Sequence, residues 1–294
     1  MAHLDIPKTY KLFIGGQFPR TESGRSFSLE NAEGGTIANL CQASRKDFRN
    51  SVAVARKAQA GWADRAAFNR SQILYRLAEM LDGRRAQLVE ELNFQGISSV
   101  DAEKEVCASV DRLVYYAGWC DKYQQVSGTV NPVASSHFNF SVPEPMGVVG
   151  ILAPDEFGLL GLVSLFAPVI VGGNTCVILA SESKPMCSIT FAEVAATSDV
   201  PAGVINILTG FREELVPHFA THMDVNSIVY AGDNDPDVKI LQEGSALNLK
   251  RVRIHRGVDW ISSSSQGPQF ILECQETKTT WHPVEVIKPK TGGY

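Results

Sequence analysis

Asp155 and Glu156 place two carboxylates at a turn where negative charge would ordinarily be bound. The stretch GVVGILAPDEFGLL, residues 147–160, predicts a buried strand, a sharp turn at Pro154 and an apolar helix, with both acids in the turn. The end of such a strand is where phosphates and developing oxyanions are bound, and carboxylates repel both. The chain therefore carries the scaffold of an anion site with the wrong charge for that chemistry.

The other residues able to do chemistry are scattered. His218 and His222 form an i, i+4 pair that could bind a metal from one helical face, but no Glu or Cys accompanies them, so we expect a surface helix end and no metal site. The cysteines form no C-x-x-C and have no His beside them at ligand spacing, which predicts reduced, mostly buried thiols. The six cysteines are Cys41, Cys107, Cys120, Cys176, Cys187 and Cys274.

Composition limits the class of protein. The 294 residues, 44% of them hydrophobic, suffice for one large domain, or one domain with an appendage, around a substantial core. A net charge of −5 provides no general basic field, so nucleic acid and anionic lipid are not expected partners. No apolar run reaches the ~20 residues of a membrane span, and the first residues, MAHLDIPKTYK, have no hydrophobic core for a signal peptide. We expect a cytoplasmic protein.

Hydrophobic spacing divides the chain into three regions. Residues 47–123 repeat apolar side chains every three or four positions, which predicts a layer of helices. One of these helices is expected to continue from Ile73 through Leu92 and to end at Gly96. Residues 126–147 are β-branched and aromatic with Pro and Gly punctuation, which predicts a two-stranded hairpin that packs against something else.

The third region alternates short β-rich runs with helical ones. Five strands separated by helices predict a doubly wound, parallel, Rossmann-like sheet of the α/β class. Ligands of such sheets bind at the carboxyl ends of the strands, where APDEF, ILASES and YAGDND lie. The expected strands are residues 148–152, 175–179, 204–208, 227–230 and 251–254.

Eight ordered motifs resemble the aldehyde dehydrogenase superfamily over residues 12 to about 257. They are LFIGGQF, NAEGG, YYAGWCDK, EPMGVVGILAP, APVIVGGNTCVI, PAGVINILTGF, THMDVNSIVYAG and LKRVRI. Within the superfamily the chain is most similar to the non-catalytic C-terminal region of two-part aldehyde dehydrogenases, a Rossmann unit with a β-flap. The resemblance implies that the catalytic domain, ordinarily 150 residues or so, is absent together with its cysteine.

The resemblance also implies that the family's catalytic positions are altered. The turn corresponds to a Pro-Trp-Asn motif whose Asn helps to hold an oxyanion, and that Asn is replaced by Glu156, an acceptor when ionised. We interpret Glu156 as a cap of the helix that begins near Phe157. The family's general base, a Glu, is replaced by His255, which could still move a proton. Cys274 lies in an alternating β pattern and is expected to be a buried or interfacial thiol, so no catalytic residue is assigned.

The cofactor positions implied by the resemblance are only partly kept. Leu179 stands where the family's ribose-binding Lys would be, whereas Glu182 matches its ribose-binding Glu. The family's Gly-Ser at the fourth strand corresponds to Gly232 and Asp233, and we interpret Asp233 as a helix N-cap. A residual cleft at Glu182 and Gly232 is thus the only candidate cofactor site, and no cofactor is expected to bind.

These features predict two domains and two competing functions. Residues 1–125 and 148–260 would form the Rossmann-like domain, and residues 126–147 and 268–294 a β-flap for oligomerisation. In the flap, the segment FILECQETKTTWHPVEVI, residues 270–287, is expected to alternate as a strand that pairs with the hairpin. One function is a non-catalytic assembly subunit that forms a homodimer, or a hetero-oligomer with a catalytic aldehyde dehydrogenase. The alternative is an NAD(P)-dependent oxidoreductase or dinucleotide-binding protein that uses the residual cleft.

Overall fold

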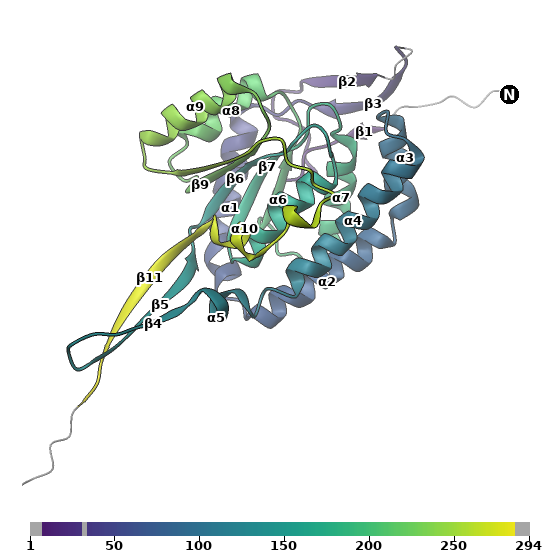
Figure 1. Cartoon of the computed structure of the whole chain (residues 1–294). Coiled ribbons are helices and arrows are strands. Elements are labelled where there is room, and N and C mark those ends of the chain that lie inside the picture. Colours follow the sequence, from purple (N-terminus) through teal and green to yellow (C-terminus); the bar gives the residue numbers. More distant parts are fainter. Residues whose placement is uncertain (1–7, 31–33, 286–294) are drawn as a thin grey trace, which may run out of the picture.

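A five-stranded parallel sheet forms the centre of the body (Figure 1). The computed structural model describes residues 8–30 and 34–285. The strand order, β10-β9-β6-β7-β8, turns in both directions from β6, which confirms the predicted doubly wound α/β class. The strands are β6 (Val148–Leu152), β7 (Thr175–Leu179), β8 (Ile205–Leu208), β9 (Ser227–Ala231) and β10 (Arg251–His255).

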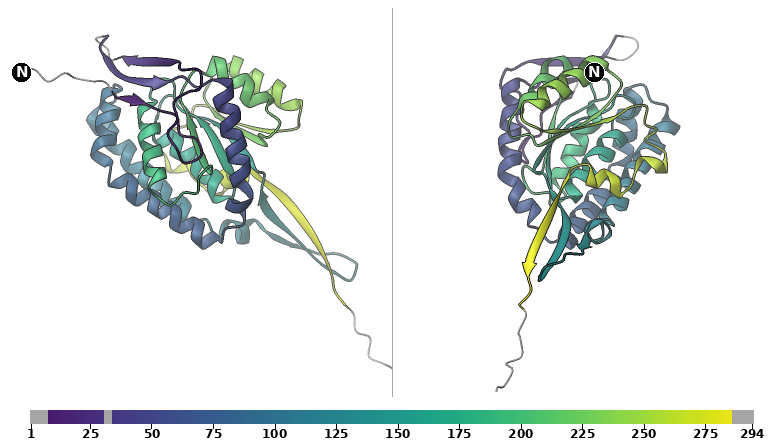
Figure 2. Two further views of the ribbon diagram at one scale, coloured as in Figure 1. Left: turned by 180° about the vertical axis from the view of Figure 1, so that it is seen from behind. Right: turned by 60° about the vertical axis from the view of Figure 1, so that its left-hand side comes forward.

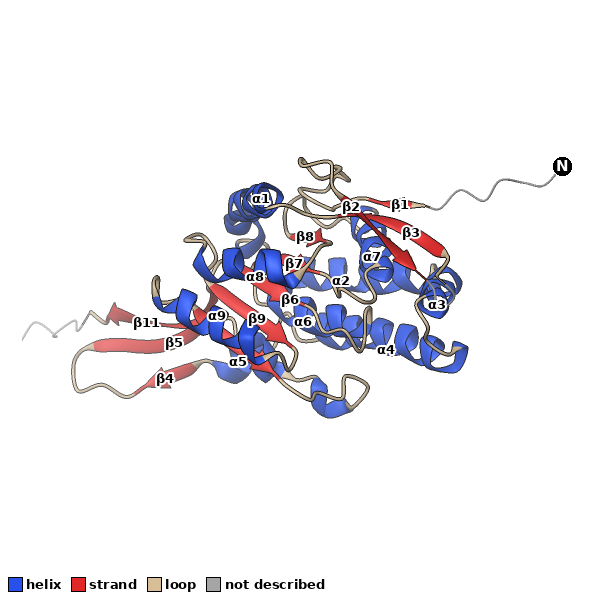
Figure 3. Ribbon diagram, turned by 90° about the horizontal axis from the view of Figure 1, so that it is seen from above, coloured by secondary structure: helices blue, strands red, loops and turns tan. Residues whose placement is uncertain are grey.

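Helices cover both faces of this sheet and create two hydrophobic cores (Figure 3). Side chains of a strand alternate between the faces, so Val149 and Ile151 join the core under α6 and α7, whereas Val148 and Leu152 join the core under α1, α8 and α9. Helices α2, α3 and α4 form an outer layer over α6 and α7. The helices are α1 (Arg45–Ala63), α2 (Ala67–Asp82), α3 (Arg85–Phe94), α4 (Ser99–Ala117), α6 (Leu160–Val171), α7 (Met186–Ala196), α8 (Arg212–Thr221) and α9 (Asp235–Ala246).

The outer layer differs from the prediction at one break. The helix expected to run from Ile73 through Leu92 is two helices, because α2 ends with Gly83 as its C-cap and the chain leaves helical geometry at Arg84. Glycine is a weak helix former, and the break redirects α3 so that it packs against α7. Both sides of the break keep apolar side chains in the same core, so apolar spacing alone did not reveal it.

Helix α6 lies wholly inside the protein. All 12 of its side chains are buried between the sheet and α4, which explains a helix that is apolar all round. The expected cap by Glu156 is wrong: α6 begins at Leu160, and Glu105 of α4 accepts the backbone N–H groups of Leu159 and Leu160 at 2.8 and 3.1 Å. In the described part of the chain no helix is both long and apolar enough to cross a membrane.

A three-stranded antiparallel flap projects from the body (Figures 1 and 2). The predicted hairpin is present, and the third strand pairs with it along its whole length, from Gln275 opposite Pro145 to Pro283 opposite His137. Residues 286–294 of the expected flap lie outside the described residues. The elements of this region are α5 (Tyr123–Ser127), β4 (Thr129–Asn131), β5 (His137–Pro145) and β11 (Gln275–Pro283).

The strand expected over residues 270–287 is confirmed from Gln275 to Pro283 and is wrong at its start. Pro268–Leu272 forms the short helix α10, which packs against α6 and buries Ile271. Pro268 occupies the first helical turn, where its missing N–H costs nothing, and a short 3-10 helix, η1 (Ser263–Ser265), precedes it. Only from Gln275 does the chain become the flap strand.

A small N-terminal sheet is tied to the body through a buried carboxylate. Its strands are β1 (Thr9–Tyr10), β3 (Thr36–Cys41) and β2 (Ser26–Glu30), in that order. Glu91 Oε1 of α3 accepts Tyr10 Oη at 2.9 Å and Thr190 Oγ1 of α7 at 2.7 Å. Glu91 Oε2 is buried without a hydrogen-bond partner, and burial raises the pKa of this carboxyl group above its ordinary value.

We predict that Glu91→Gln gains stability relative to the native chain as the pH rises from 4 to 8. The native carboxyl must ionise in a site that disfavours its charge, so the free energy of unfolding of the native chain is penalised once the pH exceeds the pKa of the unfolded state, and the full penalty is present above the raised folded pKa. Urea unfolding at both pH values measures the difference. Glu90→Gln, on the exposed face of α3, is the control, and an equal effect of Glu91→Gln at pH 4 and 8 would contradict the prediction.

Candidate site at the carboxyl ends of the strands

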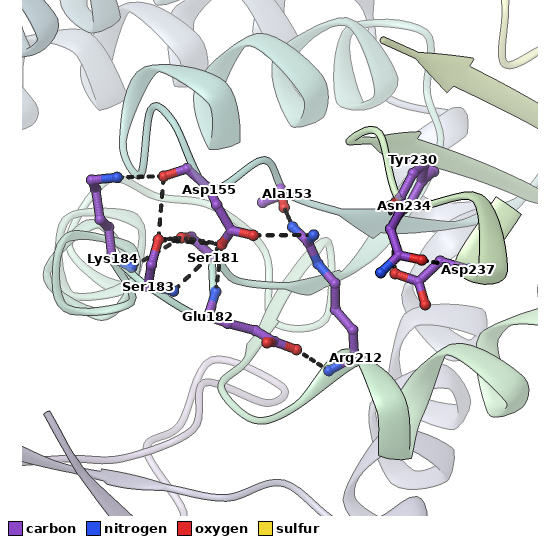
Figure 4. A network of polar contacts seen from close by, with 10 residues as sticks. All are labelled: Ala153, Asp155, Ser181, Glu182, Ser183, Lys184, Arg212, Tyr230, Asn234 and Asp237. Atoms are coloured by element: carbon purple, nitrogen blue, oxygen red, sulfur yellow. Dashed lines mark hydrogen bonds and ion pairs between the residues drawn. The ribbon is translucent and has the colours of Figure 1, made fainter. Parts of the chain in front are cut away.

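Asp155, in the turn after β6, is neutralised by the protein itself (Figure 4). Its Oδ1 accepts Ser181 Oγ at 2.8 Å and the backbone N–H of Glu182 at 3.0 Å, so it joins the turn after β6 to the turn after β7. Its Oδ2 lies 3.1 Å from Nη1 of Arg212. The charge that appeared misplaced in the sequence is therefore used to hold two loops and a helix together.

Arg212 brings the opposite charge into this group. It is the first residue of α8, and its side chain is only 13% exposed, with its guanidinium also donating to the carbonyl of Ala153 and lying 5.8 Å from the ring centre of Tyr230. The backbone N–H of Arg212 donates to Glu182 Oε1, so the Glu182 carboxylate serves the first turn of α8. Glu182, the acid at the ribose-binding position that the resemblance implies, is therefore already hydrogen-bonded within the chain.

The turn after β9 is also organised by internal contacts. Gly232 has a φ of +156°, and a Cβ there would meet Tyr230 Oη at 2.8 Å, which accounts for glycine at this position. The expected N-cap Asp233 is wrong: Asn234 caps α9, its Oδ1 accepting the N–H of Asp237 at 3.1 Å. The helix starts one residue later than expected, so the N-cap is Asn234, whose amide oxygen accepts a backbone N–H as an Asp carboxylate would.

Three of the candidate residues share one small cavity. Glu156, Gly232 and His255 line a space of about 110 Å³, and Glu182 is not among the residues that line it. His255 Nε2 lies 3.2 Å from Glu273 Oε2, and the His255 ring packs 5.4 Å from that of Phe270. The remaining lining residues are Pro154, Ala231, Asp233, Gly257, Val258 and Trp260.

Residues 256–274, here named the covering segment, close this cavity from the chain that follows β10. Trp260 is 2% exposed and lies 6.2 Å from the His255 ring. Arg112 of α4, itself 3% exposed, donates to the carbonyls of Trp260 and Ser265, both at 2.8 Å, and to Ser164 Oγ of α6 at 2.6 Å. These bonds fasten the covering segment to two helices of the body.

The thiols are poorly placed for nucleophilic chemistry. Cys274 is fully buried, and burial raises the pKa of its thiol to about 12, so the thiolate is scarce at neutral pH. Cys107 is the cysteine that is partly exposed, and all six are free. His218 lies in the last turn of α8 and His222 is its C-cap, packed edge-on against Phe48.

Sequence reasoning missed three residues on which the site depends: Glu105, Arg112 and Arg212. A signal existed for the first two, because they fall on the apolar stripe of α4 with Ala102, Ser109 and Tyr116, where a charged side chain must find buried partners. No comparable signal marks Arg212, since the first turn of α8 carries exposed polar residues as well.

Fold and site together define a Rossmann-like α/β domain with a projecting β-flap. The sequence model described as "Aldehyde dehydrogenase family" matches residues 20–259, and the chain belongs to this family. It is 32% identical over 254 residues to a putative aldehyde dehydrogenase DhaS of Bacillus subtilis (strain 168), and the match covers 85% of this chain and 50% of that protein. It is 30% identical to the cytosolic 10-formyltetrahydrofolate dehydrogenase of Mus musculus, over 86% of this chain and 29% of that protein.

Solved structures agree with this relationship. The NAD+ complex of an aldehyde dehydrogenase from Bacillus cereus superposes with a TM-score of 0.80 at 26% identity, covering 85% of this chain and 51% of the other. An NAD-dependent aldehyde dehydrogenase from Sinorhizobium meliloti gives 0.81 at 26% identity, covering 86% and 51%. The chain thus spans about half the length of these aldehyde dehydrogenases, and its described residues contain no counterpart of a catalytic domain.

We predict that Arg212→Met lowers the free energy of unfolding by about 2 kcal/mol, because Asp155 and the carbonyl of Ala153 lose a charged donor. Urea unfolding at pH 7 measures the change. Arg76→Met removes an arginine from an exposed i, i+3 pair with Glu79 and is expected to leave the free energy of unfolding nearly unchanged, because water screens an exposed pair. Equal effects of the two substitutions would show that the Arg212 contacts are no stronger than a surface ion pair.

Proposed function

We propose that this chain is a non-catalytic member of the aldehyde dehydrogenase family that acts as an assembly subunit through its flap. The observation that carries the proposal is the covering segment, which encloses His255 at the family's general-base position while the flap is left with exposed apolar side chains. We further propose a cytoplasmic location, where a reducing environment suits six free cysteines.

The chemistry of the strand ends supports a non-catalytic role. An oxyanion beside Glu156 would face a carboxylate in place of an amide donor. The thiol of Cys274 is buried and largely protonated. It lies 3.9 Å from Oγ of Ser227, the first residue of β9, whereas the cavity lies at the opposite, carboxyl end of that strand. We therefore propose that no described residue of this chain replaces the nucleophile or the oxyanion donor of the family chemistry.

The residues present do not suit a dinucleotide. Glu182 accepts the N–H of Arg212, Leu179 is a buried hydrocarbon, and the acids Asp233 and Asp235 flank the start of α9. Carboxylates at a helix N-terminus offset the helix dipole and oppose a phosphate. Nη2 of Arg256 donates to Oδ1 of Asp235 at 2.6 Å, so this nearby cation is already paired and is less available to a phosphate. We therefore propose that the chain binds no NAD(P).

The flap supplies the surface for assembly. Strands β4 and β11 are the two edges of a three-stranded sheet that stands away from the body, and such a sheet is too thin to be stable without cover (Figure 2). The exposed apolar side chains of this region are Val130, Phe138 and Trp281 in the sheet, Val126 in α5, and Val284 after the end of β11. A second subunit would pair with an edge and cover these side chains.

A homodimer with a two-fold axis is the simplest assembly, and a hetero-oligomer with a catalytic aldehyde dehydrogenase is the other partner that the flap would fit. Both place an identical or related flap opposite this one. We propose no nucleic-acid or membrane partner, because the net charge of −5 provides no general basic field.

We predict that the chain sediments as a dimer or larger assembly at micromolar concentration. Replacing Val126 and Val130 with Ser removes two flap side chains that are 67% and 69% exposed, so folding should persist while the dissociation constant rises roughly tenfold or more. Sedimentation velocity over a concentration series measures this change. Phe68→Ser, 69% exposed on α2, is the matched control and should leave assembly intact. A monomeric native chain would refute the flap as an assembly device.

The alternative, a dinucleotide-binding protein or NAD(P)-dependent oxidoreductase, is favoured by the likeness to an NAD+ complex and is tested separately. We expect protein-observed NMR titrations with NAD and NADP to give no saturation below millimolar concentration, because the cleft presents paired or acidic groups. Arg212→Ala is the informative comparison, since it removes the ion-pair partner of Asp155 while it keeps the backbone N–H that Glu182 accepts. Micromolar binding to the native chain, with shifts at Glu182 and Gly232, would support the alternative instead.

A further inference from the structure

A second, larger cavity lies beside the candidate site. It has a volume of about 450 Å³ and is formed by the turn between α3 and α4, the first half of α4, the turn after β6 and Ile261 of the covering segment. This volume is within the range of small-molecule sites, which pair apolar walls with a few polar groups. Its lining residues are Gly96, Ile97, Ser98, Asp101, Lys104, Glu105, Glu156, Phe157 and Ile261.

Glu105 presents an unused acceptor in this cavity. The residue is 2% exposed, and its Oε1 accepts the N–H groups of Leu159 and Leu160. No other described residue donates to its Oε2, although the side chain lines the cavity. Oε2 is the oxygen of this carboxylate that remains available to the cavity, so a ligand that brings an N–H group can donate to it.

The charges around the cavity select the sign of that ligand. Glu156 forms no hydrogen bond or ion pair with any other described residue, so a second carboxylate stands free on the lining. The cation on the lining, Lys104, is directed to Asp101, with Nζ 3.3 Å from Oδ1. An anion would therefore meet two carboxylates, whereas an ammonium would meet two acceptors.

Apolar walls complete the cavity. Ile97, Phe157 and Ile261 offer hydrocarbon and one aromatic ring, and Ile261 is 44% exposed. The position of Ile261 follows from the bond between Arg112 and the carbonyl of the preceding residue, Trp260. The cavity is thus built from the body and from the covering segment together.

We propose that this cavity binds a small organic cation, a primary ammonium group carried on a compact apolar body. The ammonium donates to Oε2 of Glu105 and is balanced by Glu156, while the hydrocarbon lies against Ile97, Phe157 and Ile261. A cation beside an aromatic face gains further attraction from Phe157. The site requires neither assembly through the flap nor any catalytic step, so it stands or falls independently of the proposed function.

The test compares three probes of one shape, 2-phenylethylammonium, phenylacetate and 2-phenylethanol, by protein-observed NMR titration of the full chain at pH 7.5. We expect saturable binding of the cation with shifts at Ile97, Phe157 and Ile261. The alcohol and the anion should bind roughly tenfold more weakly or worse, because they lack the charged donor. The cation is expected to bind with roughly millimolar affinity, so a titration to about 10 mM should reach saturation. Equal binding of the cation and the anion, or a cation titration that does not saturate, would overturn the proposal.

Two substitutions locate the interaction. Glu156→Gln removes the free charge at an exposed position and should weaken binding of the cation roughly tenfold. Glu105→Gln keeps an oxygen for the N–H groups of Leu159 and Leu160 but presents an amide to the cavity, and should abolish binding in a chain whose urea unfolding shows it is folded. Asp233→Asn, an acid on the neighbouring smaller cavity, is the control and should leave affinity unchanged. Unchanged affinity in Glu156→Gln, or an equal loss in Asp233→Asn, would refute the site.

Discussion

The buried guanidinium of Arg112 is the contact on which the arrangement of the strand ends depends. It makes no ion pair with another described residue, and burial lowers its pKa from the ordinary arginine value, so its charge is stabilised by carbonyl and hydroxyl oxygens. Because two of those oxygens belong to Trp260 and Ser265, satisfying the charge also fixes the covering segment. The enclosure of His255 and the wall formed by Ile261 are consequences of this one requirement.

Charged side chains in the neighbouring turns are also satisfied by partners within the chain. Asp155 and Arg212 would each be costly in a partly buried turn, but together they join the ends of β6 and β7 to the start of α8. Glu182 likewise serves the first turn of α8. Polar groups that are satisfied within the chain are less available to a ligand, which is the basis for our proposal that no dinucleotide binds here. The cavity at Glu105 differs because one carboxylate oxygen there has no donor among the described residues.

The body and the flap obey different constraints. In the body, every side chain of α6 and of the strand β6 is buried, so these elements are stabilised by packing within the chain. In the flap, β11 pairs with β5 along nine residues, but most of its side chains are exposed, so backbone hydrogen bonds carry what side-chain burial does not. The apolar side chains of these central elements are therefore buried, whereas the flap exposes apolar side chains that a partner would bury.

The sequence by itself determined the parallel sheet, since runs of apolar residues such as those of β6 and β7 alternate with helices in a pattern typical of a doubly wound α/β fold. It also determined the hairpin of the flap and which candidate residues lie at the strand ends. Local pattern could not decide the helix break at Gly83, the helical start of residues 268–272 or the true N-cap of α9, because neighbouring residues offered equally good local chemistry. The partners of Glu105, Arg112 and Arg212 were decided only by tertiary structure, because a buried charge is satisfied by atoms that are distant in the chain and adjacent only after folding.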